Sequence, residues 1–135
     1  IGKLKKVFLM VAGAAIQKFG TELDQHQQLL MAAANILNEI YMAESTLLRA
    51  EKNAKRFGEV AQEGQIAMAK LYLYNAVEIV TQNGKEGIIS FAEGDEQRMM
   101  LMGLKRFTKY SNYPNVIALR NEIAEKLKAA NKYCF

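Results

Sequence analysis

The chain has 135 residues, half of them apolar, with a formal net charge of +4 and one cysteine. A chain of this size can bury a sizeable core without disulfides or metal, and we expect a single domain over residues 1–135. It contains no run of about 18 or more uncharged apolar residues, which excludes a membrane-spanning helix. The lone Cys134 excludes an internal disulfide and a thiolate metal cluster, and it favours a reducing compartment.

An apolar run over residues 7–16 follows three lysines, a pattern shared with signal peptides. We interpret it instead as part of a first helix over about residues 4–19, because Gly13 interrupts the run and no clear cleavage site follows. The chain begins at Ile1 rather than at a methionine, so we expect a C-terminal fragment of a larger protein.

Gly20 predicts the end of the first helix, since a residue without Cβ enters the left-handed conformation at little cost. Thr21 then fits the N-cap of the next helix, with Asp24 in the place of a capping-box acid. That helix should run over residues 22–57, about 36 residues or about 54 Å, and end at Gly58. Its apolar residues recur at steps of three and four: Leu29, Ala33, Ile36, Leu37, Ile40, Ala43, Leu47, Ala50 and Ala54.

A third helix is expected from about Glu59 to a group of helix breakers around residues 83–87, followed by a short apolar connection over residues 88–91. The breakers are Asn83, Gly84 and Gly87, and the apolar residues of the connection are Ile88, Ile89 and Phe91. Asp95 is a predicted N-cap for a fourth helix, whose apolar residues are Met99, Met100, Leu104 and Phe107.

Pro114 fits the first turn of the last helix, where a missing N–H costs nothing. The predicted buried face of that helix consists of Val116, Leu119, Ile123, Leu127 and Ala130. Short links between long amphipathic helices favour antiparallel neighbours. The sequence therefore predicts an all-α fold, an up-and-down antiparallel bundle of four to five helices.

Tests for chemistry give no catalytic, cofactor-binding or metal-binding residue. A di-iron bundle needs two Glu-x-x-His pairs, whereas His26 is the only histidine. Glu22 and His26 supply too few ligands for a metal, and no nucleophile elbow or Gly-rich phosphate loop is present. Cys134, next to the end of the chain, lacks the rigid surroundings that activate a thiol.

Positive charge gathers in the last third of the chain, where the stretch after residue 104 is locally about +5. Its basic residues are Lys105, Arg106, Lys109, Arg120, Lys126, Lys128 and Lys132, against Glu122 and Glu125. Such a surface could meet phosphates, anionic lipid or an acidic protein, or it could be a solvated helix face.

Five short segments carry a resemblance to a known family. They are Phe19-Gly20, Gln27-Gln28-Leu29-Leu30, Ala34-Asn35-Ile36-Leu37, Ile40-Tyr41-Met42 and Leu48-Arg49-Ala50. Their order resembles the C-terminal helical domain of very-long-chain-type acyl-CoA dehydrogenases. The chain departs from the family pattern at Glu44 and over residues 50–53.

The resemblance implies a parent enzyme that oxidises fatty acyl-CoA to trans-2-enoyl-CoA with FAD and passes electrons to an electron-transferring flavoprotein in fatty-acid β-oxidation. The flavin and the catalytic glutamate would belong to the upstream dehydrogenase core. This chain would then be a non-catalytic domain that contacts its own core, another subunit of a homo-oligomer, or a membrane surface.

The same resemblance adds one residue to the basic tail as a candidate contact surface: Arg49, Lys105, Arg106, Lys109, Arg120, Lys126, Lys128 and Lys132. We expect the cytoplasm if the source is bacterial and mitochondria if it is eukaryotic, and no nucleic-acid partner. The alternative is a free-standing interaction module that binds an acidic partner or nucleic acid through its basic C-terminal helices.

Overall fold

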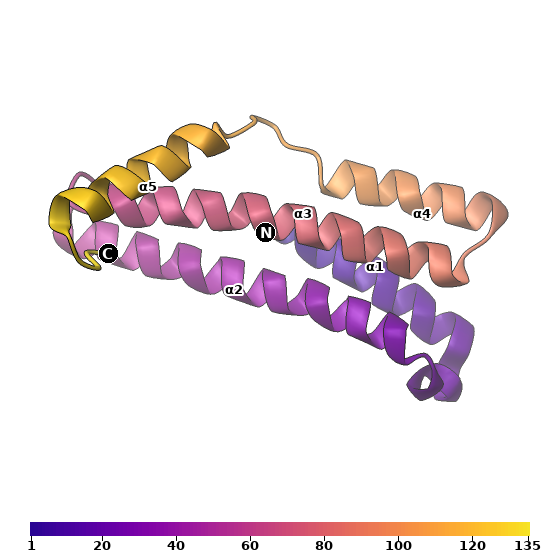
Figure 1. Ribbon diagram of the computed structural model, residues 1–135. Coiled ribbons are helices and arrows are strands. Elements are labelled where there is room, and N and C mark those ends of the chain that lie inside the picture. Colours follow the sequence, from indigo (N-terminus) through magenta and orange to yellow (C-terminus); the bar gives the residue numbers. More distant parts are fainter. The chain divides into compact units, whose positions relative to one another are not determined.

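The computed structural model describes residues 1–135 and consists of helices without strands (Figure 1). This confirms the predicted all-α bundle of four to five helices, of which the structure has five. Short connections join successive helices except before the last one. The elements in chain order are α1 (Gly2–Phe19), a 3₁₀ helix η1 (Gly20–Gln25), α2 (Gln27–Phe57), α3 (Glu63–Phe91), α4 (Gly94–Phe107) and α5 (Val116–Ala130).

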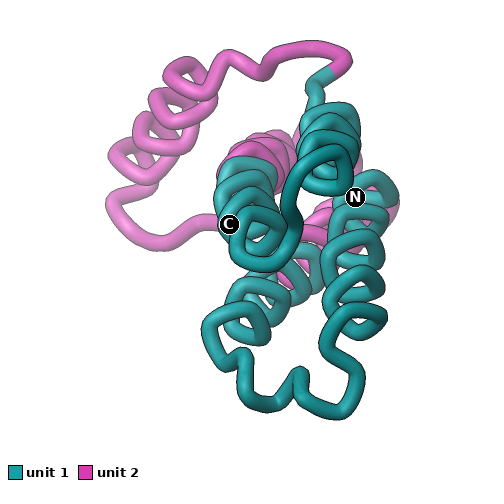
Figure 2. Tube along the Cα trace, turned by 90° about the vertical axis from the view of Figure 1, so that its right-hand side faces the viewer, with its two compact units in different colours: residues 1–41, 76–110 teal, residues 42–75, 111–135 magenta.

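The chain forms two compact units, shown in Figure 2. Unit 1 comprises residues 1–41 and 76–110, and unit 2 comprises residues 42–75 and 111–135. The two longest helices, α2 and α3, contribute to both. Whether residues 1–135 behave as one domain stays a prediction.

The turn between α1 and α2 differs from the prediction at one point. Gly20 ends α1 with φ +53°, as expected. Thr21 does not cap an α-helix, however, because residues 20–25 form the 3₁₀ helix and α2 begins only at Gln27. The His26 backbone N–H donates to the Leu23 carbonyl at 3.0 Å, and the His26 ring stacks on Phe19 with centroids 3.7 Å apart. These contacts hold the tighter turn, so α2 is five residues shorter than expected.

The predicted break around residues 83–87 is wrong, since α3 continues to Phe91. The glycines there serve close packing in unit 1. A Cβ on Gly84 would lie 3.4 Å from Val7 Cγ1, and one on Gly87 would lie 3.3 Å from Val11 Cγ1. Because both sets of residue numbers rise together, α1 and α3 run in the same direction. A helix tolerates glycine where a neighbour comes this close.

Helix α4 runs opposite to α1 in unit 1. A Cβ on Gly103 would lie 3.1 Å from the Met10 sulfur, and the Lys6 ammonium lies 5.9 Å from the centre of the Phe107 ring. Residue numbers therefore increase along α1 in the direction in which they decrease along α4, so the two helices are antiparallel. The alternation of helix directions predicted for an up-and-down bundle is present in this unit.

Three expected helix starts or links also need correction. The 88–91 segment is not a connection but the last turn of α3, where Ile88 and Phe91 are buried. Glu93 rather than Asp95 occupies the N-cap position of α4. Pro114 precedes α5, whose N-cap is Asn115. The Asn115 side-chain oxygen accepts a hydrogen bond from the Ala118 backbone N–H at 3.0 Å. It thereby satisfies one of the backbone N–H groups that have no partner within the first turn of a helix, which a proline side chain could not do.

The core of unit 1 contains large side chains, among which Ile36, Ile88, Val7, Val11 and Val80 are the largest fully buried ones. The buried apolar residues of unit 2 are all alanines: Ala43, Ala50, Ala67 and Ala69. Helix α5 buries none of its residues fully. On its predicted buried face, Val116, Leu119, Ile123 and Ala130 are half-buried and Leu127 is exposed.

The apolar stripe of α2 is confirmed at most positions, with Leu29, Ile36, Ile40, Ala43 and Ala50 buried. Two of its members, Leu37 and Leu47, are exposed. The predictions for α2 and α5 depart from the structure for one reason. Periodicity predicts which side of a helix is apolar, but not whether another segment covers that side.

Candidate functional site: contact surfaces and a small cavity

The basic residues expected to form one contact surface fall in both units. Lys105 and Arg106 lie in the last turn of α4, and Lys109 follows the helix, all in unit 1. The other five belong to unit 2: Arg49 on α2, Arg120, Lys126 and Lys128 on α5, and Lys132 after it. The charge cluster read along the sequence is therefore divided between two bodies.

Internal ion pairs offset part of this charge. Lys126 Nζ lies 3.8 Å from a carboxylate oxygen of Glu63 and 4.0 Å from one of Glu122. Lys128 Nζ lies 3.3 Å from a carboxylate oxygen of Glu125. The remaining six candidates are exposed and have no ion pair within 4.0 Å: Arg49, Lys105, Arg106, Lys109, Arg120 and Lys132.

Other residues examined for chemistry have structural surroundings. His26 is stacked on Phe19 in the turn before α2. The exposed Cys134 thiol lies 3.8 Å from the Lys126 carbonyl oxygen. No group of three or more His, Cys, Asp or Glu side chains is placed to hold a metal ion. None of the helices has the length and apolar character needed to cross a membrane.

The outward face of α1 is apolar, although the helix already buries Leu4, Val7, Val11 and Ala15 on its inward face. Leu9 is 66% exposed and Ile16 is 57% exposed, and they are seven residues apart on one side of the helix. Gly13 lies between them, and a Cβ there would meet nothing within 4 Å. We call these three residues the α1 outer face. The sequence signal was present in the apolar run over residues 7–16, which contains no charged residue.

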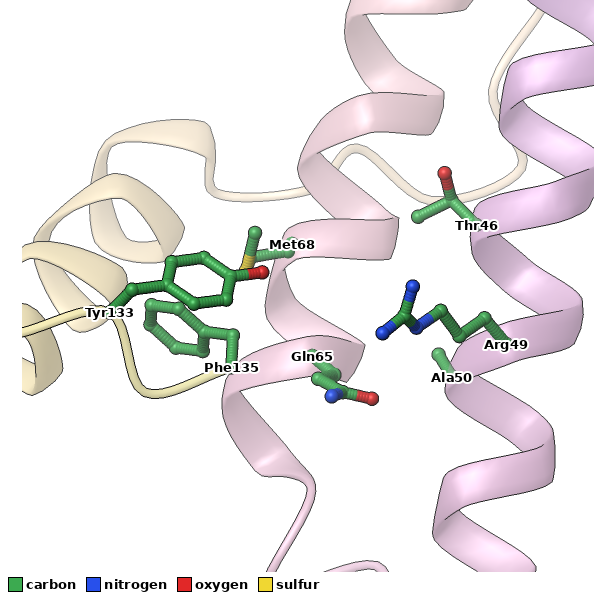
Figure 3. A pocket seen from close by; sticks show the side chains of 7 residues that line it. All are labelled: Thr46, Arg49, Ala50, Gln65, Met68, Tyr133 and Phe135. Atoms are coloured by element: carbon green, nitrogen blue, oxygen red, sulfur yellow. The ribbon is translucent and has the colours of Figure 1, made fainter.

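Unit 2 contains a cavity of about 160 Å³ beside Arg49. Its lining comes from α2, α3 and the C-terminal segment: Thr46, Arg49, Ala50, Gln65, Met68, Tyr133 and Phe135. Figure 3 shows the Arg49 side chain extending from α2 towards α3, with the Tyr133 and Phe135 rings near each other on the C-terminal segment. We call this space the Arg49 cavity. Of the predicted contact residues, only Arg49 lines it.

A second cavity of unit 2 has a volume of about 450 Å³ and shares the lining residues Gln65 and Phe135 with the Arg49 cavity. Lys126 and Cys134 are among its lining residues. The Lys126 ammonium already forms two ion pairs, so the carboxylates of Glu63 and Glu122 largely neutralise the positive charge at this cavity.

Comparison with known proteins identifies the family. Residues 3–106 match the family model described as "Acyl-CoA dehydrogenase, C-terminal domain". A probable acyl-CoA dehydrogenase of Bacillus subtilis is 32% identical over 133 residues, which is 98% of this chain and 22% of that protein. The crystal structure of an acyl-CoA dehydrogenase from Bacillus anthracis, complexed with FAD, superposes with a TM-score of 0.95 at 34% identity and covers 99% of this chain and 23% of that one.

The chain thus spans about a fifth of the length of both similar proteins. The family match ends within α4, whereas the structural match extends through α5. The resemblance read from about residues 19–53 is confirmed, and the chain belongs to the acyl-CoA dehydrogenase family, in which it corresponds to the C-terminal domain.

Proposed function

We propose that this chain is the non-catalytic C-terminal domain of an FAD-dependent acyl-CoA dehydrogenase of fatty-acid β-oxidation, and that it docks on the dehydrogenase portion through the α1 outer face. The support for a larger parent is the share of the similar proteins that the chain spans, about a fifth. Both come from Bacillus species, so we propose a bacterial, cytoplasmic setting.

We propose that FAD binds to the dehydrogenase portion, because the residues of this chain do not fit it. The Arg49 cavity, at about 160 Å³, is below the roughly 300–1,000 Å³ typical of pockets for drug-sized ligands. The larger cavity offers one lysine that is already paired with two carboxylates, which suits a pyrophosphate poorly. We therefore derive no step of flavin chemistry from these residues.

The α1 outer face is the observation that carries the docking proposal. A helix that is apolar on all sides is normally buried on all sides, whereas a surface helix keeps one polar face. In α1 no charged residue occurs between Lys6 and Lys18. Leu9 and Ile16 are more than half exposed, so covering them stabilises the docked state by about 1–2 kcal/mol each.

Gly13 adds a second reason for contact at this face. Glycine inside a helix costs about 1 kcal/mol relative to alanine, and nothing within unit 1 occupies the space beside it. A partner that approaches the α1 backbone closely would account for a glycine here. The dehydrogenase portion is the partner of choice because it belongs to the same polypeptide in the similar proteins.

The test measures the affinity between this chain and the separately produced dehydrogenase portion by titration calorimetry. Leu9→Gln combined with Ile16→Gln should weaken binding at least tenfold, which corresponds to about 1.4 kcal/mol. Met31→Gln is the matched control, since Met31 lies in the same unit on α2 and is 64% exposed. Equal affinity of the double variant and the unmodified chain would exclude this face as the docking site.

A second contact is favoured by the three unpaired cations Lys105, Arg106 and Lys109, which lie within five residues at the end of α4. Such a group attracts an anionic surface by about 1 kcal/mol per charge, and we assign it to a membrane of anionic lipid. Sedimentation with phosphatidylglycerol vesicles should decrease when all three are changed to glutamine and when salt is raised. Binding that is independent of both would remove the membrane contact. Salt-dependent binding to DNA but not to vesicles would support the free-standing module instead.

The homo-oligomer stays a proposal that follows from the parent enzyme. Its measurement is the mass of the complete polypeptide by light scattering, since a monomer in solution would contradict it.

A further inference from the structure

The Arg49 cavity has an unusual balance of hydrogen-bonding groups. Arg49 is its one lining residue with a charged side chain, and no Asp or Glu lines it. The guanidinium has five N–H donors and forms no ion pair or hydrogen bond within the chain. An arginine that faces a cavity without an acid is a ready partner for an anion from outside.

Two neutral side chains add donors to the same cavity. The Gln65 Oε1 atom accepts a hydrogen bond from Asn53 Nδ2 at 2.8 Å, which orients the amide and leaves its NH₂ group available. The Tyr133 hydroxyl is engaged in no hydrogen bond. The Thr46 hydroxyl, in contrast, already donates to the Met42 carbonyl at 2.7 Å. Arg49, Gln65 and Tyr133 therefore offer unused donors from three different segments.

The remaining wall of the cavity is apolar and held in place. The Tyr133 and Phe135 rings meet edge to face with centroids 5.9 Å apart, and Met68 lies beside them (Figure 3). The Phe135 ring rests on Gly64, where a Cβ would lie only 2.5 Å from Cε1 of that ring. The absence of a side chain at residue 64 thus lets the C-terminal segment close over the cavity.

We propose that the Arg49 cavity binds a monocarboxylate whose apolar body rests against Tyr133, Phe135 and Met68. One guanidinium with neutral donors matches a single negative charge, whereas a phosphate dianion would call for a second cation. The volume of about 160 Å³ is close to that of an engineered protein cavity that holds benzene. The carboxylate could belong to a free acid or to an acidic side chain of a partner. The inference is independent of docking through the α1 outer face, which lies in the other unit.

The probe is benzoate, titrated into the 135-residue chain and followed by the NMR signals of the Met68 methyl group and the Arg49 side-chain N–H. We expect saturable shifts with a Kd on the order of 1 mM, as suits a ligand of this size. Benzamide, which has the same shape without the charge, should bind at least tenfold more weakly. Arg49→Gln should lose binding tenfold or more, and Arg49→Lys should retain part of it.

Arg56→Gln is the matched control, because Arg56 is an exposed arginine on the same helix and lies over the Phe57 ring rather than in the cavity. Its affinity for benzoate should equal that of the unmodified chain. The unfolding midpoint of each variant, measured by circular dichroism, separates loss of the site from loss of the fold. Retained binding in a folded Arg49→Lys variant keeps the proposal testable should Arg49→Gln fail to fold.

Propionate distinguishes the two sources of the carboxylate. Tighter binding of benzoate than propionate supports a free acid with an apolar body, and equal binding supports an acidic side chain of a partner. Four results would each overturn the proposal: no saturable shift at about 50 mM, equal binding of benzamide, full binding by Arg49→Gln, or tighter binding of inorganic phosphate.

Discussion

Replacing glycine by alanine should have different effects on the stability of unit 1 at two helix positions, Gly13 and Gly84. Gly84→Ala and Gly13→Ala both replace a helical glycine, and each gains about 1 kcal/mol of intrinsic helix propensity. Gly13 faces open space in the chain by itself, so its variant should keep that gain. Gly84 is buried against α1 and α4, and there the packing decides the sign.

The cost at Gly84 follows from the atoms around it. A Cβ there would lie 2.9 Å from Leu104 Cδ1 and 3.4 Å from Val7 Cγ1. Carbon atoms attract best at about 3.5–4.0 Å, so the contact with Leu104 is too short, and Val7 is already at contact distance. Val7 and Leu104 are both buried and cannot move into solvent. Overpacking of this kind costs about 1–3 kcal/mol, which offsets or exceeds the gain in propensity. We expect Gly84→Ala to be about 1–3 kcal/mol less stable than Gly13→Ala.

Urea unfolding of the two variants and the unmodified chain, followed by circular dichroism, measures the difference. Gly13→Ala should raise the unfolding free energy by about 1 kcal/mol, and Gly84→Ala should leave it unchanged or lower it. If Gly84→Ala gains as much as Gly13→Ala, the close approach of α1, α3 and α4 in unit 1 is wrong.

Three further substitutions test the fold in different places. Ile36→Ala should cost about 2–5 kcal/mol in urea unfolding, because Ile36 is 0% exposed, whereas Leu37→Ala beside it, at a position 49% exposed, should cost less than about 1 kcal/mol. Asn115→Ala should destabilise the chain by about 1 kcal/mol through loss of the α5 N-cap, measured in the same way. Gly64→Ala should push the Phe135 ring away, and NMR should show loss of the contacts between that ring and residue 64.

Each of these has a contradicting result. Equal costs at positions 36 and 37 would mean that α2 turns a different face to the core of unit 1. An Asn115→Ser variant keeps a capping oxygen, so a loss as large as that of Asn115→Ala would exclude capping as the cause. Phe135 contacts that persist in Gly64→Ala would show that the C-terminal segment is not seated on residue 64.

Much of the fold could be predicted because it depends on local chemistry. Gly20 and Gly58 end helices at positive φ, +53° and +89°, which a residue without Cβ adopts freely. The step of three and four along α2 identified Ile36, Ile40 and Ala43 as buried because helix geometry alone places them on one side. The family, too, was readable from short segments along that helix.

The tertiary structure alone decided what depends on neighbours. In the sequence, Gly84 and Gly87 resemble helix breakers, whereas in the structure they pack against Val7 and Val11. Glycine can do either, because the lack of a side chain allows both the end of a helix and the close approach of a neighbouring one. The basic residues of the last third form a single cluster along the chain. In the fold, however, Lys126 forms an ion pair with Glu63 of α3, and the other basic residues are divided between two units.

The candidate site shows the same division. Sequence reasoning selected Arg49 from its place in a family-like segment, as one charge among eight. Only the fold brought Gln65 and the C-terminal rings to it, from residues 16 to 86 positions further along the chain. Local sequence determines which helices form and which sides are apolar, since those properties depend on residues one or two turns apart. Contacts between distant segments determine which hydrogen-bond donors meet in a cavity and which helix faces stay exposed. No local sequence pattern contains that information.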